Sequence, residues 1–185
     1  MVEALKTLRA LLSSVAVLAL PSAAFAHRLD EYLQATLVVV EPAGVRLQIN
    51  LTPGIAVAEA LLAGIDRDHD DAISRDEAAA YARRLQGDLM LRLDGQILDL
   101  TLTASDWPAP AELRDGVGVI RLEFKASYSR LGAGLHRFAF ENRHLPAVSV
   151  YLINAALPQS RVIRITRQTR SDTQATGEID FTFDP

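Results

Sequence analysis

The stretch Val117 to Tyr128 reads VGVIRLEFKASY, and apolar and polar side chains alternate along it. One side would carry Val119, Arg121, Glu123 and Lys125, and the other Ile120, Leu122, Phe124 and Ala126. Successive side chains of a β-strand point to opposite faces, so a period of two is typical of a strand with one buried face. We therefore expect a half-buried strand here.

Similar short runs recur along the chain, with turn residues between them. The other expected strands are residues 32–40, 45–51, 89–93, 96–102, 135–141, 148–153, 162–168 and 178–183. Asp94-Gly95 separates two of these runs and is a strong hairpin signal. Many short alternating strands with frequent turns predict a mainly β fold of the α+β class, an antiparallel β-sandwich.

One segment departs from the period of two and has helical character. Residues 55–64 are rich in alanine and leucine, and residues 75–85 carry apolar side chains near helical spacing. Gly87 is a plausible helix stop. The sequence predicts a single helix–loop–helix unit over residues 55–87, inserted between the second and third strands of the sandwich.

The loop of this unit, residues 66–77, reads DRDHDDAISRDE and has the spacing of a calcium-binding loop. Calcium takes six to eight oxygen ligands at loose geometry, and alternate residues of a tight turn can direct carboxylates to one point. The predicted ligands are Asp66, Asp68, Asp70, the backbone carbonyl of Ala72, Ser74 and both carboxylate oxygens of Glu77. The expected cofactor is therefore Ca²⁺.

Position 6 of the loop departs from the pattern because it is Asp71 rather than glycine. The chain turns there with positive φ, at a cost of about 1 kcal/mol for a residue with a Cβ. A solvated acidic turn without an ion is the alternative interpretation. Ser74 and Glu77 also form the S-x-x-E pattern of a helix capping box, a role compatible with ligation.

Residues 55–87 resemble the EF-hand superfamily of calcium-binding proteins. The chain also resembles a group of bacterial exported proteins through HRLDEYLQ at 27–34, LTPGIAV at 51–57 and ENRHLP at 141–146. Some relatives of that group are similar to extracytoplasmic parts of nickel/cobalt-transporter-type membrane proteins. This second resemblance implies a membrane-transporter partner and no enzymatic activity.

The N-terminus has the features of a secretory signal peptide over residues 1–26. Lys6 and Arg9 precede the apolar residues 11–20, and Ala24-Phe25-Ala26 fits a cleavage site. The apolar run is shorter than the ~20 residues that span a bilayer. We expect cleavage after Ala26 and a single mature domain, residues 27–185, without a transmembrane span, in the periplasm or secreted. An uncleaved N-terminal anchor is the alternative.

Composition excludes several classes of function. Residues 1–26 carry a net charge of +1, which leaves −5 for the mature part of this −4 chain, and nucleic-acid binding selects basic surfaces. The chain has no cysteine, so disulfides, thiolate metal sites and thiol nucleophiles are excluded. No set of nucleophile and base is evident, and we expect no enzyme activity.

Two functions remain open at this stage. The first is a calcium-binding, non-enzymatic binding or accessory module of the cell envelope, in which calcium is mainly structural. The second is an envelope metal-delivery or sensing protein for nickel, cobalt or copper that acts with a membrane transporter. It would use His27 at the mature N-terminus together with His136 or His144, because imidazole suits these metals. The polar run Glu141 to His144 is expected to be a solvated turn, and a binding turn or part of an active site is the alternative.

Overall fold

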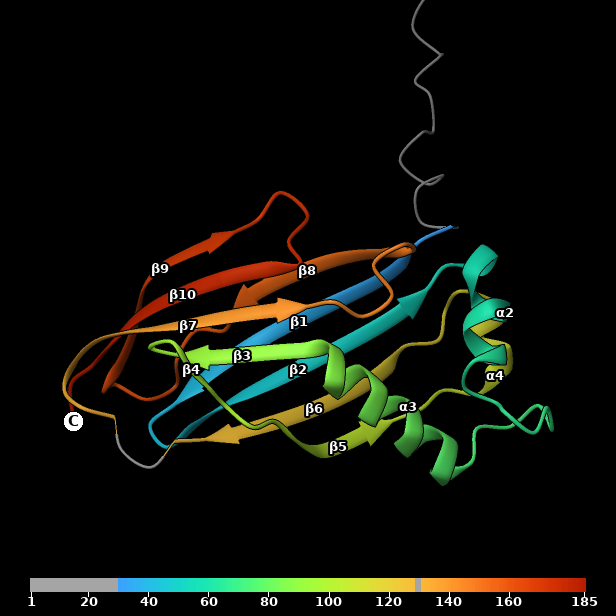
Figure 1. Cartoon of the computed structure of the whole chain (residues 1–185), viewed down its shortest axis with the longest axis horizontal. Helices are drawn as coiled ribbons and strands as arrows, with labels where there is room; N and C mark the ends of the chain where they lie inside the picture. Colours follow the sequence, from blue (N-terminus) through green and yellow to red (C-terminus); the bar gives the residue numbers. More distant parts are fainter. Residues whose placement is uncertain (1–29, 129–130) are drawn as a thin grey trace, which may run out of the picture.

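The computed structural model describes residues 30–128 and 131–185, in which two five-stranded sheets pack face to face (Figure 1). The first sheet has the order β5-β6-β2-β1-β8 and contains β1 (Tyr32–Glu41), β2 (Gly44–Pro53), β5 (Thr101–Asp106), β6 (Ile120–Ser127) and β8 (Ser149–Ala155). The second has the order β4-β3-β7-β10-β9 and contains β3 (Leu89–Leu93), β4 (Gln96–Ile97), β7 (Gly134–Asn142), β9 (Ile163–Arg170) and β10 (Thr176–Phe183). The predicted mainly β, sandwich-like α+β fold is confirmed.

The core lies between the two sheets and consists of the apolar side chains that alternate with polar ones along the strands. On β6 the four side chains of the predicted apolar face are buried, while Arg121 and Lys125 on the other face are exposed. The second sheet contributes Phe138 and Phe181, whose rings stack with centroids 5.2 Å apart. Burial of such large apolar side chains is the main stabilising contribution to folding.

One strand pair departs from the antiparallel arrangement that was expected. β8 runs parallel to β1, with Tyr32 opposite Ser149, whereas all other pairs among the described strands are antiparallel. The reason is a crossover: after β7 the chain passes from the second sheet to the first through residues 143–148, and β8 starts beside the start of β1. We call residues 143–148 the β7–β8 connection.

The prediction of a single strand over residues 96–102 was also wrong. It is divided between β4, which has two residues in the second sheet, and β5, which begins at Thr101 in the first. The hairpin at Asp94-Gly95 is present, with both residues at positive φ. The chain changes sheets within a few residues after it, which a pattern of alternation does not encode.

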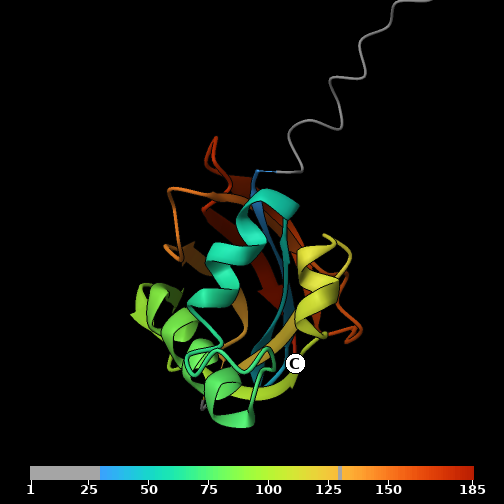
Figure 2. The same cartoon turned by 90° about the vertical axis from the view of Figure 1, so that its right-hand side faces the viewer.

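The helices gather at one end of the sandwich, as the view from that end shows (Figure 2). α2 (Ile55–Ala63) and α3 (Arg75–Asp88) lie between β2 and β3 in the chain, and α4 (Pro110–Arg114), which was not predicted, precedes β6. α3 begins with the predicted capping box of Ser74 and Glu77. It does not stop at Gly87 but ends at Asp88 and passes directly into β3. Among the described residues, no helix has the length and apolar character needed to cross a membrane.

The packing of the two sheets leads to a first prediction. Leu47 on β2 is fully buried, so Leu47→Ala should lower the free energy of unfolding by about 2–5 kcal/mol, through lost apolar burial and a residual cavity. Leu157→Ala is the control, because Leu157 is 90% exposed and should change the stability by about 0.5 kcal/mol or less. Urea denaturation measures both, and equal effects would contradict the assigned core.

Candidate metal centre

Three carboxylates meet in the loop between α2 and α3. Asp66, Asp68 and Asp70 each place one carboxylate oxygen so that the three atoms lie within 4.8 Å of one another. Asp66 is buried, whereas Asp68 and Asp70 are exposed, so the cluster is closed on the protein side and open toward solvent. Desolvation, and then the charges of Asp70 and Glu77, raise the pKa of Asp68.

Asp66, at the start of the loop, uses one carboxylate oxygen in a hydrogen bond, and its other oxygen has no partner among the described residues. Its Oδ2 accepts a hydrogen bond of 3.0 Å from the backbone N–H of Asp71. Its Oδ1 is buried and has no hydrogen-bond partner among the described residues. A buried polar atom without a partner is uncommon in folded proteins, since it has lost its water without replacement. A cation between the three carboxylates would satisfy this atom.

The sharp turn of the loop occurs at His69 and Asp71, which have φ of 59° and 63°. The turn is held by the N–H of Ala72, which donates to Oδ1 of Asp70 over 2.9 Å. Asp71 adopts the left-handed conformation for which glycine is usual, as expected for position 6 of the loop.

The side chain of Asp71 forms an ion pair with Arg114 on α4. Arg114 donates from Nη2 to Oδ1 of Asp71 at 2.7 Å and from Nε to Oε2 of Glu59 at 2.8 Å. Exposed ion pairs of this kind contribute about 0–1 kcal/mol each. Arg114 thereby joins the loop and α2 to α4, and it directs the Asp71 carboxylate toward α4.

Glu77, at the last position of the loop, is largely buried and holds the two ends of the loop together. Its Oε1 accepts from the N–H of Arg67 at 2.5 Å, and its Oε2 accepts from the hydroxyl and the N–H of Ser74 at 2.8 and 3.0 Å. These hydrogen bonds, led by that of Arg67, lower the pKa of Glu77 to about 2. Glu77 is therefore ionised at neutral pH, but its carboxylate lies outside the group of three that converge.

The six predicted ligands thus divide into two sets. Asp66, Asp68 and Asp70 come together, while Ser74 and Glu77 bond to each other and the N–H of Ala72 holds the turn. Ile73, the apolar residue of the loop, packs partly buried against the core. The ligand assignment itself stays a prediction. No protein-family model matches the chain, and no curated protein has a significantly similar sequence, so the resemblance to EF-hands rests on these residues alone.

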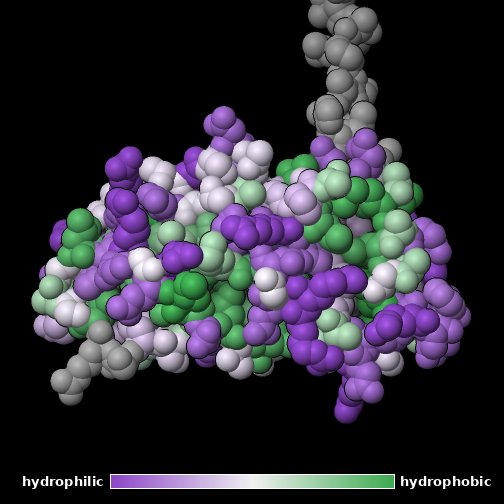
Figure 3. Space-filling model, in the orientation of Figure 1, coloured by the Kyte–Doolittle hydropathy of each residue, from purple (hydrophilic) through white to green (hydrophobic). Residues whose placement is uncertain are grey.

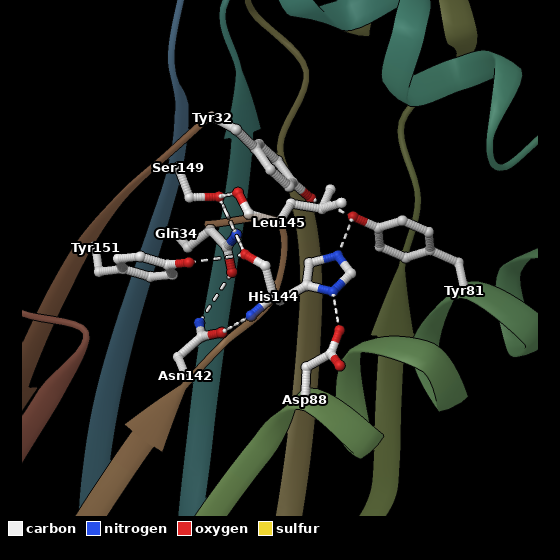
Figure 4. A network of polar contacts seen from close by, with 9 residues as sticks. All are labelled: Tyr32, Gln34, Tyr81, Asp88, Asn142, His144, Leu145, Ser149 and Tyr151. Carbon is white, nitrogen blue, oxygen red and sulfur yellow. Dashed lines mark hydrogen bonds and ion pairs between the residues drawn. The ribbon is translucent and has the colours of Figure 1, made fainter. Parts of the chain in front are cut away.

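A second polar cluster, which the sequence analysis missed, lies under α3 (Figure 4). His144 is fully buried and Asn142 nearly so, and this corrects the expectation that residues 141–144 form a solvated turn. Only Glu141 and Arg143 make a surface ion pair, at 2.7 Å. The available signal was the strand period: Asn142 is in phase with Phe138 and Phe140, the buried face of β7.

The hydrogen bonds of the His144 ring and its burial together favour one protonation state. Nδ1 lies 2.7 Å from Oδ2 of Asp88, and Nε2 lies 2.9 Å from the hydroxyl of Tyr81. A carboxylate only accepts, so Nδ1 carries a proton. The lowered pKa of His144 favours the neutral ring, in which Nε2 accepts from the hydroxyl of Tyr81. The Tyr81 oxygen in turn accepts from the hydroxyl of Tyr32 at 2.7 Å. Burial is the largest cause that lowers the pKa of His144, although Asp88 opposes it.

The contacts of His136 favour the protonated ring instead. Its Nδ1 lies 2.7 Å from Oδ2 of Asp94, and its Nε2 lies 2.7 Å from the carbonyl of Gly132. Both partners are acceptors, so both ring nitrogens donate only when the ring is a cation. Desolvation opposes the charge, but the bonds to Asp94 and Gly132 outweigh it and raise the pKa of His136. His27, the other proposed metal-binding histidine, lies outside the described residues.

The two histidines should therefore titrate on opposite sides of about 6.5, the ordinary histidine pKa. The lowered pKa of His144 means that its contribution to stability is present above about 6.5 and is lost as pH falls through its folded-state value. The raised pKa of His136 gives a contribution that is present below about 6.5 and is lost as pH rises through its folded-state value. NMR titration of the imidazole signals measures both values, and the reverse order would contradict the assigned hydrogen bonds.

Proposed function

We propose that the chain binds one calcium ion in the loop of residues 66–77 and acts as a non-enzymatic binding or accessory module of the cell envelope. The observation that carries the proposal is the convergence of Asp66, Asp68 and Asp70 around a buried carboxylate oxygen without a partner. All donors at this point are oxygens, which suit hard cations such as calcium rather than nickel or copper. Glu77 would complete the ligand set by exchanging some of its backbone hydrogen bonds for the ion.

We further propose that the ion braces the structure and is not a signal. Sensor proteins of this type open a helix pair and expose an apolar groove when calcium binds. Here the faces that such an opening would expose are already packed in the core: Leu61 and Leu62 on α2, and Tyr81 and Leu85 on α3, are buried, and only Ile55 at the start of α2 is a large apolar side chain of these helices with half of its surface exposed. Hydrophilic residues cover α3 and the loop beside it on the outer surface (Figure 3). The loop and α3 therefore present little apolar surface to a target.

The cellular setting of the proposal is the periplasm or the exterior, reached through the signal peptide expected at residues 1–26. Those residues lie outside the described part of the chain. The alternative, delivery of nickel, cobalt or copper through His27, would need a second imidazole. Both ring nitrogens of His136 and of His144 already have hydrogen-bond partners, so each ring would have to give up one of them to bind a metal.

Isothermal titration of the mature domain tests the proposal. We expect a calcium Kd of about 10⁻⁵ to 10⁻³ M, in the weaker part of the range for such loops because Asp71 occupies the glycine position. Asp66→Ala and Glu77→Ala should each abolish calcium binding, since they remove the first and last ligands.

Asp76→Asn provides the matched control, because Asp76 is an exposed acidic residue of the same loop at a position that supplies no ligand. It should keep the affinity within about twofold, as expected when a solvent-exposed charge that supplies no ligand is removed. If all three variants bind calcium like the parent protein, the loop is a solvated acidic turn. Tight binding of nickel or copper, with no calcium binding, would favour the delivery function.

Bracing predicts little change in exposed apolar surface. The fluorescence of a hydrophobic dye should therefore differ by less than about twofold between calcium and chelator, because the buried faces of α2 and α3 stay in the core. A several-fold rise in dye fluorescence with calcium would show instead that the helices open to recruit a partner.

A further inference from the structure

One face of α3 joins the candidate metal centre to the buried polar cluster. Tyr81 follows Glu77 by four residues, and Asp88 follows it by eleven. At about 100° per residue, these spacings place both side chains within about 40° of Glu77 around the helix axis. One side of α3 thus carries the carboxylate of Glu77 in the first turn, the hydroxyl of Tyr81 in the middle and the carboxylate of Asp88 at the end.

Both of these polar groups bond to the imidazole of His144. Tyr81 meets Nε2 at 2.9 Å and Asp88 meets Nδ1 at 2.7 Å, as seen from close by in Figure 4. Two contacts separated by seven residues along one helix face fix both its rotation and its position along the axis. Because the ring is fully buried, water cannot replace either contact without opening the core.

The same histidine sets the shape of the β7–β8 connection. Its carbonyl accepts from Nε2 of Gln34 at 2.8 Å and from the hydroxyl of Tyr151 at 2.9 Å, and its N–H donates to Oδ1 of Asn142 at 2.9 Å. Leu145, the next residue, has φ of 49°, a left-handed conformation that is costly for a bulky side chain. The network around His144 holds the chain in this strained form.

The connection beyond His144 exposes four consecutive apolar residues, Leu145 to Val148. In the space-filling view, hydrophobic residues gather where this connection approaches α2 (Figure 3). The backbone of Val148 also reaches β1, because its carbonyl accepts from the N–H of Tyr32 at 2.7 Å. A displacement of α3 would therefore act on an exposed part of the surface through buried contacts.

We propose that His144 couples the metal centre to the β7–β8 connection, so that a divalent cation in the loop and the ordered form of residues 143–148 stabilise each other. The inference rests on the proposed function, since it takes calcium as the ion. Calcium that draws in Glu77 favours the placement of α3 in which Tyr81 and Asp88 reach His144. Coupling of this kind is reciprocal: weakening the contacts at His144 weakens calcium binding by the same factor by which calcium strengthens the contacts.

Tyr81→Phe tests the coupling directly. It keeps the ring, which packs edge-on against the only tryptophan, Trp107, and removes the hydroxyl that bonds to His144 and Tyr32. The calcium Kd should rise about three- to tenfold by isothermal titration, corresponding to about 0.7–1.4 kcal/mol. Measured where both proteins are fully folded, this Kd does not respond to a loss of global stability alone.

Tyr128→Phe is the matched control, because it removes a hydroxyl that bonds to the Glu41 carbonyl at the β1–β2 turn and leaves α3 untouched. Its Kd should equal that of the parent protein. Equal Kd values for the parent protein and Tyr81→Phe would overturn the coupling while leaving the calcium site intact. A parent protein that does not bind calcium would instead defeat the proposed function itself.

Hydrogen exchange on the unmodified protein gives a second test that requires no variant to fold. Calcium should slow exchange several-fold at the N–H groups of Tyr32, His144 and Val148, whose bonds depend on the β7–β8 connection. The N–H of Gln174 in the β9–β10 turn, bonded to the Ser171 carbonyl, is the internal control and should not respond. Unchanged exchange around His144 under saturating calcium would overturn the inference.

Discussion

The placement of α3 depends on one buried imidazole. His144 accepts from Tyr81 and donates to Asp88, and its backbone carbonyl collects donors from β1 and β8. Without these bonds a buried ring and a buried carbonyl would remain unsatisfied, at a cost of about 1–3 kcal/mol for each group. A helix inserted between strands of two different sheets thereby becomes part of the sandwich rather than an appendage, and the acidic loop at its start acquires a fixed orientation.

The loop itself is organised largely through its own carboxylates. Asp66, Asp70 and Glu77 each accept backbone N–H groups of the loop, which shapes the chain, yet negative charge is concentrated where three side chains converge. Such an arrangement would suit a hard cation. Two contacts of Asp71 compensate for its occupying the position at which glycine is usual. Its N–H is used inside the loop, and its carboxylate is neutralised from outside by Arg114.

Short sequence patterns correctly predicted those structural features that depend only on residues close together in the sequence. The alternation in residues 117–128 gave the buried face of β6, and the S-x-x-E pattern gave the cap of α3. The parallel pairing of β1 and β8, the division of residues 96–102 between two sheets and the burial of His144 were missed. Each depends on where the chain crosses between sheets, and the His144 cluster joins residues that are far apart in sequence. The convergence of Asp66, Asp68 and Asp70 was implied by spacing, whereas Arg114 had no local signal.

A crystal structure of the mature domain grown with millimolar calcium is the most direct test of the proposed metal centre. We expect one ion about 2.3–2.6 Å from carboxylate oxygens of Asp66, Asp68 and Asp70, with Glu77 turned to supply both of its oxygens and Tyr81 still bonded to His144. A structure in which the loop keeps its present hydrogen bonds and holds no ion, or in which calcium binds elsewhere, would contradict calcium binding by residues 66–77.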